Sequence, residues 1–234
     1  MKKSDLSLYV VLDLPRAGKN AVRLVSAVLR GGATILQLRD KRPVTMPLMR
    51  LARGIRPWLN EKGVLLIIND RVGLALDCGA DGVHVGQQDL DPREARAMAE
   101  REGKPHFAIG VSVSTVEEAR KAVAARADYL SVSPLFGTAT KTDLVRPAGL
   151  EGLRSIRVEL PLVPIVAIGG IQAANAGDVI RAGADGVAVI SAVISAIRPE
   201  LTTRRIAAAV AEAKKTKEKG EHHEETRGID DRRI

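Results

Sequence analysis

The stretch GADGV occurs at residues 79–83 and again at 183–187, and both copies join a helical pattern to a short apolar run. Looser versions are RADYL at 126–130 and GGATIL at 31–36. A glycine at such a junction permits the left-handed conformation in which many helices end. We interpret these repeats as helix-to-strand turns that serve stability and not as binding sites.

Short apolar runs with strand-like residues alternate along the chain with longer stretches of helical spacing, such as 114–126. This alternation predicts parallel strands joined by crossover helices. The runs are residues 8–12, 34–39, 64–69, 82–86, 107–113, 129–133, 162–168 and 186–191. Eight such units predict an α/β fold, the single-domain (β/α)8 or TIM barrel, with a doubly wound open sheet as the alternative.

The end of the chain has a different composition, because residues 214–234 are almost wholly polar and charged. Such a segment cannot bury enough apolar surface to fold by itself. We therefore predict a barrel catalytic domain over residues 1–213 and a disordered, charged tail over 214–234.

The formal net charge of +8 and the pI near 9.9 indicate anionic partners. With one Trp, two Tyr and two Phe, the chain lacks the aromatic platforms on which single-stranded nucleic acid stacks. No apolar run approaches the length of a membrane span. We expect small anionic substrates, no nucleic acid and no membrane, and the sequence leaves the oligomeric state open.

The single cysteine, Cys78, excludes an internal disulfide and a cysteine metal cluster. Its neighbours predict a small buried residue at the end of a helix. The N-terminal apolar run is short and is broken by Asp13 and Pro15, so it does not resemble a signal peptide. We expect a cytoplasmic protein.

In a barrel of this kind, the loops after the strands carry the chemistry. The segment QLRDK, at 37–41, follows the second predicted strand. Its alternation places Gln37, Arg39 and Lys41 on the inward face, whereas Leu38 and Asp40 point away. Buried polar groups need a partner. An anion site is the preferred interpretation, and a buried network with nearby acids is the alternative.

Two acids follow neighbouring strands, Asp70 in IIND at 67–70 and Asp89 in HVGQQD at 84–89. The ends of adjacent parallel strands are close together, so the two carboxylates can share one cation. Oxygen ligands suit Mg²⁺. Alternatively, Asn69 and Asp70 form only a turn, and Asp89 caps the helix predicted from residue 91.

Later loops add further anion-binding groups. Ser112 is a possible hydrogen-bond donor to an anion, and its role is left open. Ser114 starts a Ser-x-x-Glu capping pattern and is expected to cap a helix. The glycine- and threonine-rich loop that follows offers hydroxyls and a lysine, which suits phosphate or, alternatively, a solvent-exposed loop. Its residues are Thr138, Thr140 and Lys141, and phosphate-binding loops are also predicted at Gly169, Gly170 and Ser191.

These features form two groups, which indicates two phosphorylated substrates or one substrate with a phosphate at each end. No nucleophile has a partner base in the sequence, and His84, between two valines, is interpreted as a packed, hydrogen-bonded residue. A metal pair beside cations, without a base, indicates loss of a pyrophosphate leaving group.

The motifs resemble those of the thiamine phosphate synthase family in order and spacing, from Tyr9 to Ile197. They are QLRDK at 37–41, IIND at 67–70, DGVHVGQQD at 81–89, GVS at 110–112, TATK at 138–141, AIGGI at 167–171 and ISAV at 190–193. The resemblance implies a transferase, EC 2.5.1.3, that joins 4-amino-2-methyl-5-(diphosphooxymethyl)pyrimidine to 4-methyl-5-(2-phosphoethyl)thiazole. The products would be thiamine phosphate and pyrophosphate, with CO2 if the thiazole is carboxylated.

The resemblance also implies roles for individual residues. Asp70 and Asp89 would hold one Mg²⁺ per subunit, and Arg39, Ser112 and Lys141 would act in catalysis. The pyrimidine diphosphate would be bound by Gln37, Leu38, Arg39, Asp40, Lys41, Asn69, Ser112 and Lys141. The thiazole phosphate would be bound by Thr138, Ala139, Thr140, Gly169, Gly170, Ile190 and Ser191.

Three positions depart from the family pattern: Ser114 replaces a common His, Gly137 a common Pro, and Gln88 a frequent acid. The related thiazole tautomerases are thought to use that His, so Ser114 favours the synthase. The competing hypotheses are a tautomerase-like isomerase without a metal, a catalytically silent phosphate-binding barrel, and a nucleic-acid binder attracted by charge alone.

Overall fold

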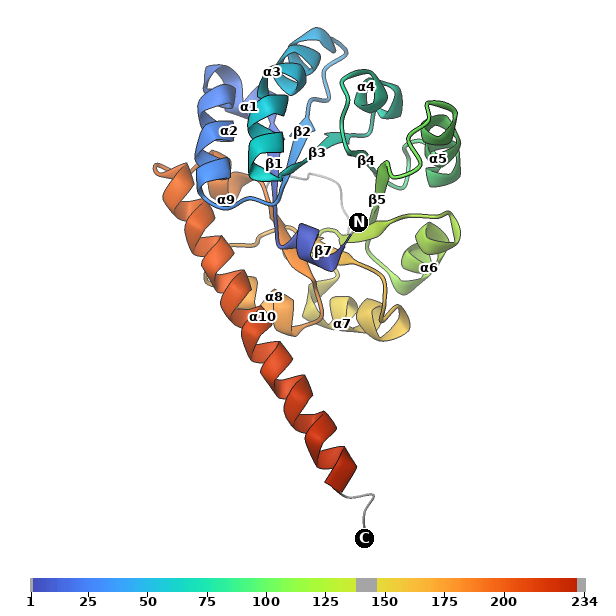
Figure 1. Cartoon of the computed structure of the whole chain (residues 1–234), viewed down its shortest axis with the longest axis vertical. Coiled ribbons are helices and arrows are strands. Elements are labelled where there is room, and N and C mark those ends of the chain that lie inside the picture. Colours follow the sequence, from blue (N-terminus) through green and yellow to red (C-terminus); the bar gives the residue numbers. More distant parts are fainter. Residues whose placement is uncertain (1, 138–146, 231–234) are drawn as a thin grey trace.

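Eight parallel strands close into a barrel in the order β1 to β8, with helices around the outside (Figure 1). The computed structural model of the 234-residue chain describes residues 2–137 and 147–230, with side chains described as far as Lys217. The strands are β1 (Leu8–Asp13), β2 (Ile35–Arg39), β3 (Leu65–Asn69), β4 (Gly82–Val85), β5 (Ala108–Val113), β6 (Tyr129–Val132), β7 (Ile165–Ile168) and β8 (Gly186–Val189).

The α-helices are α1 (Leu14–Ala17), α2 (Ala21–Arg30), α3 (Met46–Lys62), α4 (Val72–Asp77), α5 (Pro92–Arg101), α6 (Val116–Ala124), α7 (Gly149–Glu159), α8 (Ala176–Arg181), α9 (Ser191–Ile194) and α10 (Pro199–Asp230). Two 3₁₀-helices, η1 (Lys3–Leu6) and η2 (Gly18–Asn20), precede β1 and α2. The predicted barrel is confirmed, and the open sheet is wrong because β1 pairs with both β2 and β8.

The core has two layers, as strand alternation requires. In β2, Leu36 and Leu38 are fully buried between the strands and the helices, whereas Ile35 packs inside the barrel with Tyr9 and Tyr129. The predicted two-residue period of this strand is therefore confirmed. Each such fully buried large apolar side chain contributes about 1.5–3 kcal/mol to folding.

The repeated turns fix the strand register at the amino-terminal end of the barrel. The Asp185 N–H donates to the Ile165 carbonyl at 2.7 Å, and its carboxylate accepts the Ile165 N–H at 2.8 Å. Asp81 binds Leu66 and Asp128 binds Ile109 in the same two-way manner. Each repeat thus connects neighbouring strands, which confirms that these segments are structural turns.

An arginine from a preceding helix binds each of these carboxylates. Arg56 of α3 binds Asp81, Arg96 of α5 binds Asp128, and Arg157 of α7 binds Asp185. The guanidinium of Arg157 also donates to the carbonyls of Gly183, Leu160, Pro161 and Val163. Each unit therefore joins a helix, a turn and a strand through charge-assisted hydrogen bonds.

Two local predictions about caps are corrected by the structure. The N-cap of α6 is Thr115, whose hydroxyl accepts the Glu118 N–H, and not Ser114. Ser114 instead donates its N–H and hydroxyl to the Glu118 carboxylate, because the extended chain enters the helix one residue later than expected. The N-cap of α5 is Asp91, so Asp89 does not cap that helix.

Helix α10 also differs from the sequence expectation, because it continues through residues 214–230 of the segment predicted to be disordered. Lysine and glutamate, which are common there, favour helical backbone without a buried core. In Figure 1, this helix runs along the barrel and extends past it. Lys214 donates to the Ser7 hydroxyl at 2.8 Å, so the helix is attached to the barrel up to this point.

Replacing Asp185 with alanine is predicted to destabilise the barrel by about 3 kcal/mol, because it leaves Arg157 largely buried without its carboxylate partner. Asp178→Ala provides a matched control, since it removes an exposed pair with Arg181 that contributes about 0–1 kcal/mol. Urea denaturation of both variants measures the difference, and equal stabilities would contradict a structural role for the turn.

Candidate active site

The carboxyl ends of β2 to β5 bring polar side chains to one cavity of about 610 Å³. Its lining includes the predicted anion-binding and metal-binding residues of these strands, and it extends into the barrel interior. The predicted site residues on its walls are Gln37, Arg39, Lys41, Asn69, Asp70, Asp89, Ser112 and Ile190. Parallel strands end at one face of the barrel, which explains why residues far apart in sequence meet here.

Arg39, at the end of β2, is held by a carboxylate that the sequence analysis did not select. Arg39 forms an ion pair with Asp13, the last residue of β1 and its register partner. Asp13 is buried and also accepts the Arg16 N–H as the N-cap of α1. The pair fixes the guanidinium near the cavity while part of it stays exposed. The contact between Asp13 and Arg39 depends on the register of β1 with β2, which the sequence pattern does not specify.

A chain of hydrogen bonds crosses the barrel interior beneath the cavity. Gln37 Nε2 donates to the Tyr9 hydroxyl at 2.7 Å, and the hydroxyls of Tyr9 and Tyr129 are 3.0 Å apart. His84 Nδ1 is 3.1 Å from the Tyr129 hydroxyl, and His84 Nε2 is 3.0 Å from Ser112 Oγ. The chain confirms that His84 is a packed, hydrogen-bonded residue, and it orients Ser112 at the cavity.

Tyr9 and Tyr129, the two tyrosines of this hydrogen-bond series, stay neutral. Burial raises the pKa of the Tyr9 and Tyr129 hydroxyls well above the ordinary value. Gln37 donates to the Tyr9 hydroxyl, which must then donate its own proton to the next group. If each group donates to the next in this direction, every group in the series has a hydrogen-bond partner. Tyr9 donates to Tyr129, Tyr129 to His84 Nδ1, and His84 Nε2 to Ser112, a proton arrangement assigned from the hydrogen-bond pattern.

Two carboxylates at the rim of the cavity repel one another. Burial, together with the charge of Asp89, raises the pKa of Asp70, whereas Lys41, 3.4 Å away, lowers it. Asp70 has a left-handed backbone with φ of 62°, and Asp89 accepts the Gly86 N–H at 2.7 Å. Within the described residues no cluster of three or more metal-ligating side chains occurs, so a cation here would depend on this pair and on ligand or water oxygens.

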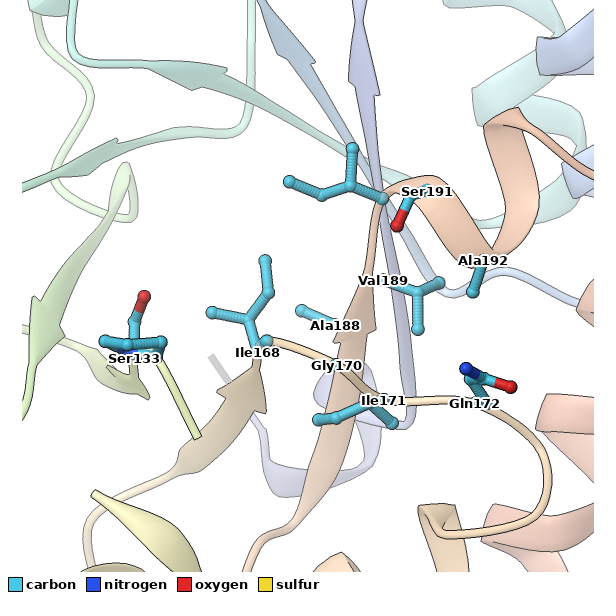
Figure 2. Close-up of a pocket in the computed structure, with 12 residues that line it drawn as sticks. Ser133, Ile168, Gly170, Ile171, Gln172, Ala188, Val189, Ser191 and Ala192 are labelled. Carbon is cyan, nitrogen blue, oxygen red and sulfur yellow. The ribbon is translucent and has the colours of Figure 1, made fainter. Parts of the chain in front are cut away.

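A second cavity of about 330 Å³ lies between the loop after β7 and the start of α9 (Figure 2). Gly169 and Gly170 have φ of 117° and 65°, a conformation that glycine adopts without strain. Ser191 starts α9, where the first backbone N–H groups have no partner within the helix. The glycine loop and Ser191 thus line one hollow, and a helix start with a hydroxyl suits an anion.

The two cavities adjoin. Both are lined by Ser133, Ile168, Ala188 and Ile190, which form a common wall at the ends of β6, β7 and β8. A molecule in one cavity would therefore lie next to a molecule in the other. This arrangement suits a reaction that joins two small molecules.

Not every residue selected from the sequence lines these cavities. The side chain of Leu38 is fully buried in the outer core, and Asp40 is buried and paired with Arg42, so both point away as the strand alternation predicted. The selected residues Thr138, Ala139, Thr140 and Lys141 lie outside the described part of the chain. Gln88 and Ser114, two departures from the family pattern, line the larger cavity.

The fold and these cavities define a class: a (β/α)8 barrel with charged and hydroxyl side chains around cavities at the carboxyl ends of its strands, where enzymes of this fold have their active sites. Among the described residues, no helix combines the length and the apolar character needed to cross a bilayer.

Comparison with known proteins narrows this class. The profile of the family described as thiamine monophosphate synthase matches residues 8–193. A thiamine-phosphate synthase of Roseiflexus sp. (strain RS-1) is 50% identical over 207 residues, covering 88% of this chain and 86% of the relative. One of Chloroflexus aurantiacus is 45% identical, covering 88% and 94%. The solved thiamine phosphate pyrophosphorylase of Pyrococcus furiosus superposes with a TM-score of 0.80 and 38% identity, covering 90% and 98%.

The chain therefore belongs to the thiamine monophosphate synthase family, as the sequence motifs predicted, and is an enzyme of the transferase class.

Gly110→Ala is predicted to disrupt the interior of the barrel, because a Cβ there would lie 2.0 Å from the Tyr129 ring. Overpacking of this kind costs about 1–3 kcal/mol or more, and it would also displace the Tyr129 hydroxyl from His84. Gly54→Ala in α3 is the control, since its Cβ would meet nothing within 4 Å. That change should stabilise the helix by about 0.5–1 kcal/mol. Thermal unfolding distinguishes the two, and an unaltered Gly110→Ala variant would contradict this packing.

Proposed function

We propose that this chain makes thiamine phosphate by joining a pyrimidine methyl diphosphate to a thiazole phosphate, with release of pyrophosphate. The observation that carries the proposal is the pair of adjoining cavities with a common wall at the ends of β6 to β8. The larger cavity combines cations with a carboxylate pair, and the smaller one combines glycine-loop amides with a serine. The two cavities thus suit two phosphorylated substrates.

The pyrophosphate end of the pyrimidine substrate is assigned to the rim of the larger cavity. Arg39 offers a guanidinium already oriented by Asp13, and Lys41 and Asn69 add further donors. Asp70 and Asp89 would hold one Mg²⁺, and a cation there would relieve the repulsion between the two carboxylates, which adds to the effect of burial in raising the pKa of Asp70. When bound, Mg²⁺ would neutralise charge on the departing pyrophosphate.

The pyrimidine ring is assigned to the inner end of the larger cavity. Gln37 and Ser112 are fixed there by the hydrogen-bond chain through Tyr9, Tyr129 and His84. Because the tyrosine hydroxyls stay protonated, this part of the site offers oriented dipoles and not an anion that could attack a carbocation.

The thiazole phosphate is assigned to the smaller cavity, on Gly169, Gly170, Ile190 and Ser191. The family resemblance alone supports the same role for Thr138, Ala139 and Thr140, and a role for Lys141 beside the leaving group. The common wall would bring the thiazole nitrogen next to the pyrimidine methylene carbon.

The reaction needs no general base. The carbon–oxygen bond to pyrophosphate breaks with its electron pair on oxygen, and the thiazole nitrogen lone pair then forms the new carbon–nitrogen bond. That nitrogen carries no proton to remove. Arg39, Lys41 and Lys141 would stabilise the charge on the leaving oxygen, and a carboxylated thiazole would also release CO2.

The proposal extends to partners and location. The lone buried Cys78, whose pKa is raised by burial, fits a reducing cytoplasm, and the substrates are small phosphorylated molecules. The scarcity of aromatic residues supports a function without nucleic acid, and we propose no membrane partner.

Purified protein is predicted to form thiamine phosphate and pyrophosphate from the two substrates with Mg²⁺ but not with EDTA. Asp89→Asn and Asp70→Asn should lower kcat/KM about 100-fold or more, because one carboxylate of the pair is lost. Asparagine tolerates the left-handed backbone at position 70, so the fold is preserved. Asp77→Asn is the control, because Asp77 is an exposed acid that, like Asp70, follows β3.

No product from folded protein that still binds the thiazole phosphate would refute the proposed activity. Product of equal amount in EDTA would refute only the metal assignment. Chromatography of thiamine phosphate, coupled to a pyrophosphate assay, distinguishes these results.

Ser191→Ala is predicted to raise KM for the thiazole phosphate about tenfold, because one hydroxyl donor to a charged group is lost. KM for the pyrimidine diphosphate should change much less, since Ser191 does not line the larger cavity. Steady-state kinetics with each substrate varied in turn measures both constants. A larger effect on the pyrimidine substrate would reverse the assignment of the two cavities.

A further inference from the structure

A third cavity, of about 350 Å³, lies outside the barrel between α1–α2 and the segment that joins α9 to α10. Four arginines line it: Arg16 on α1, Arg23 and Arg30 on α2, and Arg198 before α10. Arg23 and Arg30 are seven residues apart, which places them on one face of the helix. The cavity is therefore strongly cationic, and it is separate from the two cavities described above.

The acids nearby do not neutralise this charge. Among the described lining residues Glu200 is the one acid, and it already binds Arg30 and Arg204, each at 2.8 Å. Within the described part of the chain, the side chains of Arg16, Arg23 and Arg198 make no hydrogen bond or ion pair. Three guanidinium groups around one hollow repel one another, so an anion bound among them would relieve this repulsion.

Apart from Asn20, the remaining lining residues are apolar. Ala17, Leu24 and Ala27 are buried behind the cavity, and Ile194 and Ile197 border it. A volume of this size is within the range of small-molecule sites, which combine apolar walls with a few charged groups. Planar guanidinium groups bind phosphate oxygens with two hydrogen bonds each, which favours a phosphate ligand over a carboxylate with fewer oxygens.

We infer that this cavity binds a diphosphate group, free or as the ester of a small organic molecule, at a site distinct from the active site. Several arginines can contact a diphosphate at once, whereas a single phosphate would leave some of them without a contact. The lining contains no pair of carboxylates, so binding here requires no metal ion.

Two short helices connect this cavity with the active site. Arg16 and Ala17 of α1 line it, and α1 is capped by Asp13, which also binds Arg39. Helix α9 begins at Ser191 in the smaller active-site cavity and ends at Ile194 in this one. The diphosphate site is thus adjacent to the catalytic residues without containing any of them.

Calorimetric titration of the full-length protein with inorganic pyrophosphate in EDTA tests the inference. We expect a metal-independent site that the Arg23→Glu/Arg198→Glu double variant binds about tenfold or more weakly. Arg50→Glu on α3, an exposed arginine that does not line the cavity, should bind like the wild type. Inorganic phosphate should bind more weakly than pyrophosphate.

Absence of metal-independent binding, or equal binding by wild type and double variant, would overturn the site. The single variant Arg23→Gln replaces the double variant if circular dichroism shows that the latter is unfolded. ADP in place of pyrophosphate distinguishes an esterified ligand from a free one. Because binding is measured without turnover, failure here is separate from failure of the proposed activity, which the double variant should retain in the Mg²⁺ assay.

Discussion

A carboxylate that joins two strands and a helix is the interaction on which this barrel depends. Asp81, Asp128 and Asp185 each exchange hydrogen bonds with the first residues of a neighbouring strand and bind an arginine from a helix. Parallel strands cannot fix their register through a tight turn, since each connection passes through a helix. The aspartate supplies this register at the amino-terminal end, and Thr34 does so with a hydroxyl that accepts the Leu8 N–H. Once the registers are set there, the opposite strand ends meet at the active site.

The inside of the barrel imposes a second constraint, because the site needs polar groups where the fold needs a packed core. Tyr129 reaches across the interior only because Gly110 leaves room for its ring. The hydroxyls of Tyr9 and Tyr129 are then satisfied by one another, by Gln37 and by His84, and among the described residues no buried side-chain polar atom lacks a partner. A fully satisfied network costs little stability and holds Ser112 rigidly. Packing and function therefore use the same side chains.

The sequence predicted what depends on local pattern. Strand alternation placed Gln37 and Arg39 inward and Leu38 outward, and the GADGV repeats marked the turns. Contacts between distant strands were not predictable in this way. The Asp13–Arg39 pair depends on the register of β1 with β2, and the link from His84 to Tyr129 joins β4 to β6. The cap of α6 was misplaced by one residue because Ser114 and Thr115 both offer a hydroxyl, and it is the Thr115 hydroxyl that accepts the Glu118 N–H while Ser114 donates to the Glu118 carboxylate.

The distribution of charge separates the two ends of the barrel. At the amino-terminal turns each arginine has its own carboxylate, as in Arg157–Asp185, so the charges are balanced and the interaction is purely structural. At the carboxyl end the balance is incomplete. Arg39 and Lys41 pair with Asp13 and Asp70, but Asp89 adds a carboxylate without an ion pair among the described residues. The pKa of Asp70 is raised first by burial and then by the charge of Asp89. The proposed binding of a cation and a polyanion at this end would use such unbalanced charge, whereas a turn that only holds a strand does not need it.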